Sequence, residues 1–220
     1  MNILVHLKLK STRTFPSSRV RAYTTRSNIL SYAPPRVLRP HIYHQISASR
    51  LEAADNAARI AKEEFTVYAD GSRYHGGVGA AARTETPLGM LVIKEHLGLS
   101  EEHLPVEGEL LSITLGLRII NTMPFLTRAT IFVDCQQAIR EAVSGRSVHR
   151  ELIARFDAEL RGTRRSLRSL RIAWVPGHEG VAMNEAVDKD AKAAAEGESS
   201  TRIIISPAYY GQVQIGGRLL

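Results

Sequence analysis

The segment ATIFVDC, residues 129–135, constrains the fold of this chain more than any other feature. Its residues are apolar at successive positions, so a strand formed here would be apolar on both faces. Such a strand is stable only where both sides of its sheet are covered. Residues 129–135 therefore predict the central strand of a covered sheet, and with it an α/β architecture.

The order of the neighbouring segments extends this prediction. Alternating apolar and polar residues predict three strands within residues 64–98, reversing around TETPLG. Helical periodicity and a further apolar run predict helices at 105–124, 136–145, 148–170 and 183–197, and a last strand at 170–178. We expect a five-stranded mixed sheet, with three antiparallel strands followed by two parallel ones, and helices on both faces.

Length and composition limit the class of protein. The chain has 220 residues, enough for one full domain with appendages. A single cysteine, Cys135, excludes an internal disulfide framework and fits a reducing compartment. No apolar stretch approaches the roughly 18 residues that span a bilayer. These features predict an intracellular protein, nuclear or cytoplasmic, with no membrane partner, and we expect a monomer.

The net charge of +7 is unevenly distributed. Residues 1–50 contain nine basic residues and no acidic ones, whereas residues 51–220 contain 20 basic and 22 acidic residues. The body of the protein is therefore not a basic module that coats nucleic acid. Any nucleic acid that it handles must be bound by local patches, or its charge must be neutralised by metal.

Four regions are expected along the chain. Residues 1–32 are basic and acid-free; poor amphipathic periodicity favours a disordered tail over a mitochondrial presequence, which would direct import. Residues 33–64 predict a proline-containing linker and a short helix that begins at Ser49. Residues 65–197 form the folded domain, and residues 198–220 are a tail that either adds a short strand or is disordered.

Acidic side chains occupy positions where the pattern predicts burial: Asp70, Glu109, Asp134 and Asp188. Asp70 and Asp134 lie near the carboxyl ends of strands, where ligands cluster in open α/β sheets. Glu109 shares a helix face with Gly116, and a glycine there allows close approach to the sheet. Each acid also has a purely structural interpretation: a turn at Asp70, a first-turn acid at Glu109, or a pair between Asp188 and Lys192.

Convergence of all four acids on one end of the sheet favours a metal site over four separate coincidences. Clustered carboxylates repel one another unless cations neutralise them. Oxygen ligands without an accompanying Cys/His cluster select hard ions, Mg²⁺ before Mn²⁺. Two such ions about 4 Å apart suit in-line attack on a phosphodiester. We therefore expect two Mg²⁺ ions, with Mn²⁺ as the alternative.

Four motifs together resemble a ribonuclease H type 1 domain: YADGS, GELLSITLGL, FVDCQQAI and WVPGHEGVAMNEAVDKDAK. The segment APPR ahead of them is similar to the one that precedes ribonuclease H in fungal non-LTR retrotransposon reverse transcriptases. The resemblance covers residues 33–196 and implies the ribonuclease H-like fold. It also implies hydrolysis of the RNA strand of RNA·DNA hybrids. No polymerase segment is present, so the chain looks like a stand-alone or truncated C-terminal piece.

The resemblance also implies a role for each acid. Asp70 would bridge both ions, Glu109 and Asp134 would complete the site on the leaving-group side, and Asp188 would hold the ion on the nucleophile side. His178, in the PGHEG loop, would assist proton transfer or product release.

Two further positions are expected to contact the hybrid. Gln136 would lie in its minor groove, and Ser72 would lie close to the scissile strand. Recognition would depend on the shape of the hybrid and its 2′-hydroxyls.

Two departures from the family pattern keep other interpretations open. Met183 and Val187 stand where the family usually has Gly and Ala, and their bulk would shift Asp188 and weaken the second metal site. An alternative is a non-catalytic, hybrid-binding remnant of a retrotransposon reverse transcriptase. A third is a related four-carboxylate nuclease, against which GHEG…NEAVD argues.

Overall fold

The computed structural model describes residues 42–87, 89–123, 125–163, 167–177 and 180–205. For residues 202–205 it describes the backbone alone. The strands are β1 (Ile42–Gln45), β2 (Phe65–Tyr74), β3 (Gly77–Thr86), β4 (Gly89–Leu99), β5 (Arg128–Val133), β6 (Ser169–Trp174) and β7 (Ser200–Ile205). The helices are α1 (Arg50–Glu63), α2 (Pro105–Thr122), α3 (Gln136–Ser144), α4 (Arg150–Gly162) and α5 (Ala182–Ala195).

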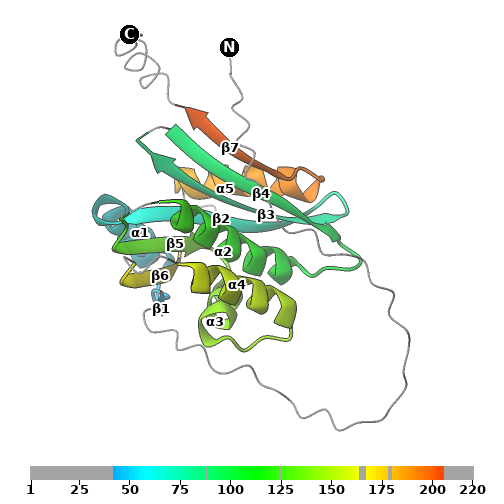
Figure 1. The fold of residues 1–220 in the computed structure, drawn as a ribbon, viewed down its shortest axis with the longest axis horizontal. Helices are drawn as coiled ribbons and strands as arrows, with labels where there is room; N and C mark the ends of the chain where they lie inside the picture. The colour runs from blue at the N-terminus through cyan, green and yellow to red at the C-terminus, as the bar shows by residue number, and fades with distance from the viewer. Residues whose placement is uncertain (1–41, 88, 124, 164–166, 178–179, 206–220) are drawn as a thin grey trace.

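All seven strands form one mixed sheet in the order β1-β6-β5-β2-β3-β4-β7 (Figure 1). Strands β2, β3, β4 and β7 pair antiparallel, while β2, β5, β6 and β1 pair parallel. The predicted fold class is confirmed, including the antiparallel meander followed by two parallel strands. The strand number was too low, because β1 and β7 extend the two edges of the predicted sheet.

The central position of β5 is also confirmed. Five of its six residues are buried, as the doubly apolar pattern predicts. The β2–β3 hairpin turns through two residues, His75 and Gly76, with φ of 46° and 83°. Positive φ at both positions defines a type I′ turn, whose twist suits a two-residue hairpin.

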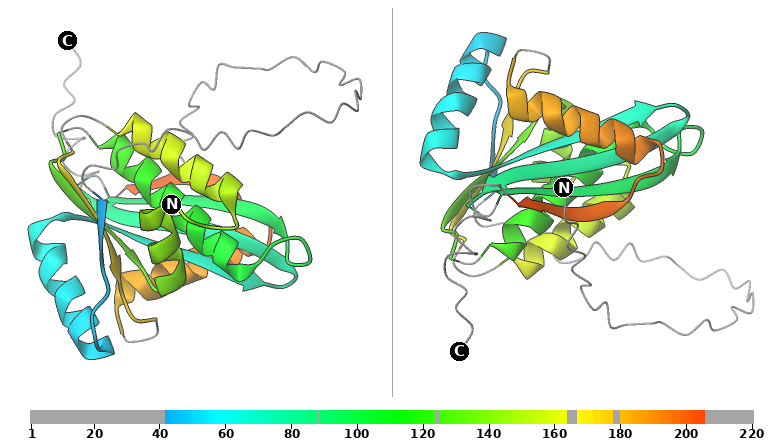
Figure 2. Two further views of the ribbon diagram at one scale, coloured as in Figure 1. Left: turned by 90° about the horizontal axis from the view of Figure 1, so that it is seen from below. Right: turned by 90° about the horizontal axis from the view of Figure 1, so that it is seen from above.

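Helices cover the two faces unequally (Figure 2). Helices α2, α3 and α4 pack against one face in the larger hydrophobic cluster, which includes Phe156 and Ile131. Helices α1 and α5 contribute to a second cluster, where Ala57 and Ile60 meet Val187 and Ala191. Because apolar residues cover both faces of the sheet, a polar residue buried in it needs a partner, as Thr130 of β5 has in Glu64.

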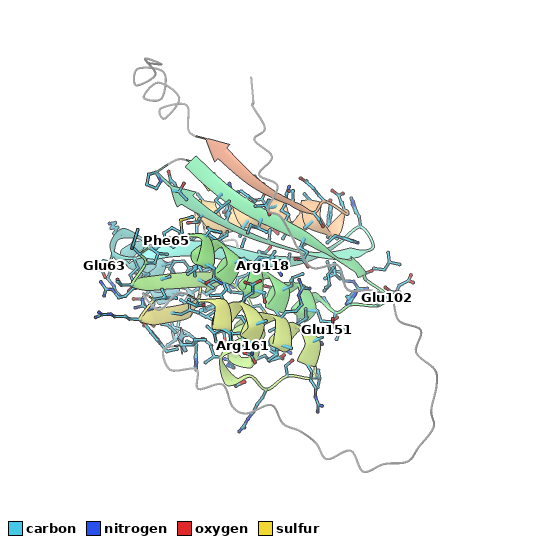
Figure 3. All side chains as sticks on the ribbon, viewed as in Figure 1. Glu63, Phe65, Glu102, Arg118, Glu151 and Arg161 are labelled. Carbon is cyan, nitrogen blue, oxygen red and sulfur yellow. The ribbon has the colours of Figure 1, made fainter. Side chains whose placement is uncertain are left out.

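Ion pairs join the layers at their margins. Arg118 on α2 donates to Glu95 of β4 (2.9 Å) and to Glu159 of α4 (2.7 Å), in the region labelled in Figure 3. Arg155 of α4 also pairs with Glu95, so two arginines accompany the two carboxylates between the sheet and α4. This arrangement holds α2, which carries Glu109, at a fixed angle to the sheet.

The interpretation of residues 33–64 needs correction at 42–45. Helix α1 begins as expected, with the Ser49 hydroxyl accepting a hydrogen bond from the backbone of Glu52 (3.2 Å). Residues 42–45, however, are not linker but the edge strand β1, paired with β6. Residues 1–41 lie outside the described part of the chain, as do 206–220 of the predicted tail.

The helix predicted at 148–170 is shorter than expected. Helix α4 ends at Gly162, and residues 169–170 already belong to β6. These two residues adopt a strand because β6 pairs with β1 on one side and with β5 on the other, which buries Leu170. Among the described residues, no helix combines the length and hydrophobicity needed to cross a membrane.

Candidate active site

The register of the sheet brings Asp70 and Asp134 together. Strands β2 and β5 run parallel, and the last pair in their register is Tyr68 opposite Phe132. Asp70 lies two residues further along β2, and Asp134 directly follows the end of β5 at Val133. The parallel pairing therefore brings the two carboxylates to the same end of β5.

Close contact between glycines adds Glu109. A Cβ on Gly71 would lie 2.2 Å from the backbone nitrogen of Glu109, and one on Gly108 would lie 2.9 Å from the Gly79 carbonyl oxygen. Only glycine permits such an approach of backbone to backbone. Further along the same helix, a Cβ on Gly116 would lie 3.2 Å from the Cγ2 atom of Ile131, so this glycine allows the close approach to the sheet that its position predicts. The first turns of α2 therefore press Glu109 against the strand that carries Asp70.

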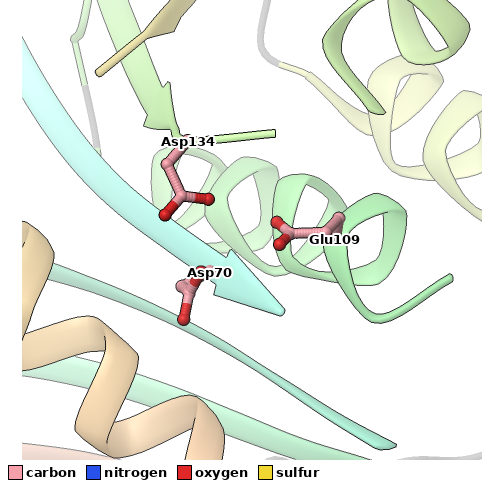
Figure 4. A group of neighbouring side chains, drawn as sticks. All are labelled: Asp70, Glu109 and Asp134. Carbon is pink, nitrogen blue, oxygen red and sulfur yellow. The ribbon is translucent and has the colours of Figure 1, made fainter. Parts of the chain in front are cut away.

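The three carboxylates form a compact cluster in which one oxygen of each lies within 4.8 Å of the others. Figure 4 shows the three side chains converging from β2, α2 and the end of β5. Asp70 is only 6% exposed. The Oε2 atom of Glu109 is buried and has no hydrogen-bond partner in the described part of the chain. A buried carboxylate oxygen without a donor is costly unless a cation binds it.

Burial and mutual repulsion make ionisation of all three carboxyl groups unfavourable. Burial, followed by repulsion from Asp134 and Asp188, raises the pKa of Asp70 to about 8. Burial also raises the pKa of Glu109 well above its ordinary value, and the charges of Asp70 and Asp134 add to this effect. The cluster thus disfavours full ionisation in the absence of a positive charge.

The donor set fits a hard divalent cation. All three side chains offer carboxylate oxygens, which Mg²⁺ and Mn²⁺ prefer over nitrogen or sulfur. The orphaned Glu109 oxygen supplies a ligand that no protein group uses. Asp70, Glu109 and Asp134 are therefore the residues that could hold such an ion.

Asp188 lies outside this group of three. It lies near enough for its charge to raise the pKa of Asp70, but its Oδ2 accepts a hydrogen bond from the Lys192 ammonium (2.7 Å). This is the helical i+4 pair that the sequence offered as the structural alternative. The structure therefore assembles three of the four predicted acids and places the fourth beside them in an ion pair.

The other predicted site residues are Ser72, Gln136 and His178, and the first two are not members of the carboxylate cluster. Ser72 lies two residues beyond Asp70 on β2 and is buried. Gln136 opens α3 after Asp134, and its amide oxygen accepts a hydrogen bond from Arg140 (2.9 Å). His178 lies outside the described residues.

Sequence reasoning did not anticipate how the connection from β6 to α5 contacts the cluster. Gly177 lies so close to Asp134 that a Cβ there would approach Oδ2 to 2.9 Å. The side chain of Trp174 donates from Nε1 to the Asp134 carbonyl oxygen (3.0 Å). The PGH motif gave a signal for a loop, but its packing against Asp134 depends on tertiary structure.

Met183 and Val187 are part of the second hydrophobic cluster. Val187 is fully buried, and Met183 packs against the cluster from its margin. Their extra volume relative to Gly and Ala therefore fills space between α5 and the sheet. Whether this shifts Asp188 stays a prediction.

The fold and the carboxylates define a class of protein: an α/β domain with an acidic cluster suited to a divalent cation. The RNase H family model matches residues 62–196, more than half of the chain. The chain therefore belongs to the RNase H family.

Two solved structures illustrate the similarity. RNase H1 from the halophilic archaeon Halobacterium salinarum NRC-1 is 15% identical, with a TM-score of 0.46, over 61% of this chain and 98% of that one. The N-terminal RNase H domain of Rv2228c from Mycobacterium tuberculosis, solved as a fusion with maltose-binding protein, is 20% identical. Its TM-score is also 0.46, over 59% of this chain and 98% of that one. A search of the curated proteins gave no significant match.

Proposed function

We propose that the protein is an Mg²⁺-dependent endonuclease that hydrolyses the RNA strand of RNA·DNA hybrids. The observation that carries the proposal is the cluster of Asp70, Glu109 and Asp134, with one carboxylate oxygen of each within 4.8 Å of the others. Membership of the RNase H family supports the substrate class. A buried and unpaired Glu109 oxygen supports a cation as the missing partner.

Asp70, Glu109 and Asp134 would hold one ion, and Asp70 would share a second with Asp188. Bound Mg²⁺ supplies charge stabilisation at the phosphate and a water molecule of lowered pKa. Asp188 must leave Lys192 to take part, and exchange of this partly exposed pair costs little, typically about 0–1 kcal/mol. We assign His178 to proton transfer or product release from its motif, and Ser72 and Gln136 to contacts with the hybrid.

The charge distribution agrees with this arrangement. Residues 51–220 have two more acidic than basic residues, so the domain has no general attraction for polyanions. Substrate binding would then depend on ions held by the carboxylates and on local donors. Selection of RNA would depend on the 2′-hydroxyl groups and the shape of the hybrid.

A cleavage assay with labelled RNA·DNA hybrid tests the proposal. We expect endonucleolytic cuts in the RNA strand with Mg²⁺, none with EDTA, and loss of at least about a hundredfold in rate for Asp134→Asn. The matched control is Asp55→Asn, because Asp55 is an exposed acid on α1, away from the cluster. Its rate should equal that of the unaltered protein.

The assay also separates the competing interpretations. Binding of the hybrid without cleavage at any Mg²⁺ or Mn²⁺ concentration would refute the enzymatic proposal and favour a non-catalytic module derived from a retrotransposon reverse transcriptase. Cleavage of DNA or of plain RNA duplex at a similar rate would favour a different nuclease of the four-carboxylate type.

A further inference from the structure

Strand β1 and nearly all of helix α1 precede the region that matches the family, which begins at residue 62. Both are nevertheless integrated into the domain. Strand β1 extends the parallel side of the sheet, with Ile42 opposite Leu170 and Gln45 opposite Ala173. Helix α1 lies on the same side of the sheet as α5 and buries Ala57 in the cluster that they share (Figure 2).

Buried polar contacts fix the carboxyl end of this added unit. Glu64 accepts hydrogen bonds from Thr130 of β5 (2.7 Å) and Arg171 of β6 (3.2 Å). Arg171 also donates to the hydroxyl of Tyr43 on β1 (2.9 Å) and lies over its ring. Since the Glu64 side chain is only 6% exposed, this network holds α1 firmly relative to β5 and β6.

At its other end α1 reaches the candidate active site. The guanidinium of Arg50, its first residue, donates from Nη2 to the carbonyl oxygen of Gly177 (2.7 Å). These residues are 127 positions apart in the sequence. Gly177 in turn lies against Asp134, at the contact distance where a Cβ would meet Oδ2. A continuous path therefore leads from the added helix through one backbone carbonyl to a carboxylate of the cluster.

We propose that Arg50 is a positioning residue for Asp134. Its hydrogen bond holds the backbone of Gly177 against the Asp134 carboxylate and so limits that side chain to orientations directed at Asp70 and Glu109. The added unit of β1 and α1 would thereby be part of the ion-binding architecture. The catalytic consequence rests on the proposed nuclease activity, whereas the effect on the carboxylate does not.

Variants of the full-length chain can test this inference. Arg50→Ala removes the donor, while Arg50→Lys keeps a cation that can donate to the same carbonyl. Arg59→Ala is the matched control, because Arg59 is an exposed arginine of the same helix that pairs locally with Glu63 (3.3 Å). Binding of Mg²⁺ and Mn²⁺ is measured by calorimetry, and hydrogen exchange is measured in peptides that span the β6–α5 connection.

For Arg50→Ala we expect ion affinity to fall about three- to tenfold and exchange in the connection to rise, as for loss of one solvent-exposed hydrogen bond. Arg50→Lys should recover most of the affinity, and Arg59→Ala should match the unaltered protein. In hydrolysis assays at fixed Mg²⁺, kcat should fall while KM for the hybrid stays unchanged, since Arg50 positions a ligand and contacts no substrate.

Unchanged ion affinity and unchanged exchange in Arg50→Ala would overturn the inference, as would an equal loss in Arg59→Ala. A second variant, at Gly177, alters the contact between this residue and Asp134 directly. Gly177→Ala should displace Asp134 and lower ion affinity at least as much as Arg50→Ala. If the unaltered protein cleaves no hybrid, the proposed function fails, but the affinity and exchange measurements still decide the role of Arg50.

Discussion

Replacement of Asp70 by asparagine should stabilise the metal-free protein at alkaline pH and leave its stability near pH 5 almost unchanged. The folded protein raises the pKa of this carboxyl from 3.8 to about 8, chiefly through burial. In the unfolded chain the same group is ionised above about pH 4. Between these values the folded state binds a proton that the unfolded state does not bind, so stability falls as the pH rises.

The size of the effect follows from the pKa change. A pKa moved from 3.8 to about 8 corresponds to roughly 6 kcal/mol, at about 1.4 kcal/mol for each tenfold change in proton affinity. This is an upper limit, because relaxation and water entry reduce the penalty of a buried charge. We expect the free energy of unfolding to fall by about 2–4 kcal/mol between about pH 5 and about pH 8.5. Glu109, whose pKa is also raised, adds to the fall.

Urea unfolding in EDTA, followed by circular dichroism at both pH values, measures this difference. Asp70→Asn should lose most of the pH dependence, and Asp55→Asn, an exposed acid on α1, should retain it. Addition of Mg²⁺ at alkaline pH should stabilise the unaltered protein by about 2.7 kcal/mol at one hundred times the dissociation constant. Asp70→Asn should gain much less. If the variant and the unaltered protein differ equally at both pH values, Asp70 is not the strained carboxyl described above.

Three substitutions test other parts of the structure by thermal or urea unfolding. Gly71→Ala should destabilise the protein by about 3 kcal/mol or more, because its Cβ would collide with the backbone of Glu109. Val187→Ala should cost about 1–3 kcal/mol if Val187 fills a packed core, and a neutral effect would contradict its complete burial. Glu64→Ala should cost about 3 kcal/mol, because it leaves the poorly exposed Arg171 without its carboxylate partner; retention of full stability would contradict the network.

The strands and helices with a regular apolar pattern were predictable from sequence because the pattern shows which faces of each element are buried. Strand β5 is apolar on both faces, and the three strands of the meander alternate before turns. Strand β1 could not be predicted in the same way. Its four residues follow a proline-rich stretch, and tertiary contacts such as the bonds from Arg171 to Tyr43 support it. The end of α4, by contrast, had a local signal in Gly162, which the prediction of a helix to residue 170 did not use.

The site was predictable to the extent that topology determines it. Carboxylates at the corresponding ends of neighbouring parallel strands lie close together, so the nearness of Asp70 and Asp134 follows once the pairing of β2 with β5 is known. The position of Asp188 was harder to predict, because its carboxylate can pair either with Lys192, four residues along the helix, or with an ion at the cluster. The contact of Arg50 with Gly177 joins residues 127 positions apart, and no pattern in a single sequence predicts it.

The partners of other carboxylates in the chain support a cation at the cluster of Asp70, Glu109 and Asp134. Other poorly exposed carboxylates have cationic partners within the chain: Arg171 binds Glu64, Arg118 binds Glu95 and Lys94 binds Glu198. The buried Oε2 of Glu109 has no such donor in the described part of the chain. Close glycine contacts instead press this carboxylate toward two others, which raises the free energy of the metal-free fold. Protonation relieves part of this cost, as the raised pKa of Asp70 shows. A divalent ion would relieve it as well and would also occupy the Glu109 oxygen that lacks a donor.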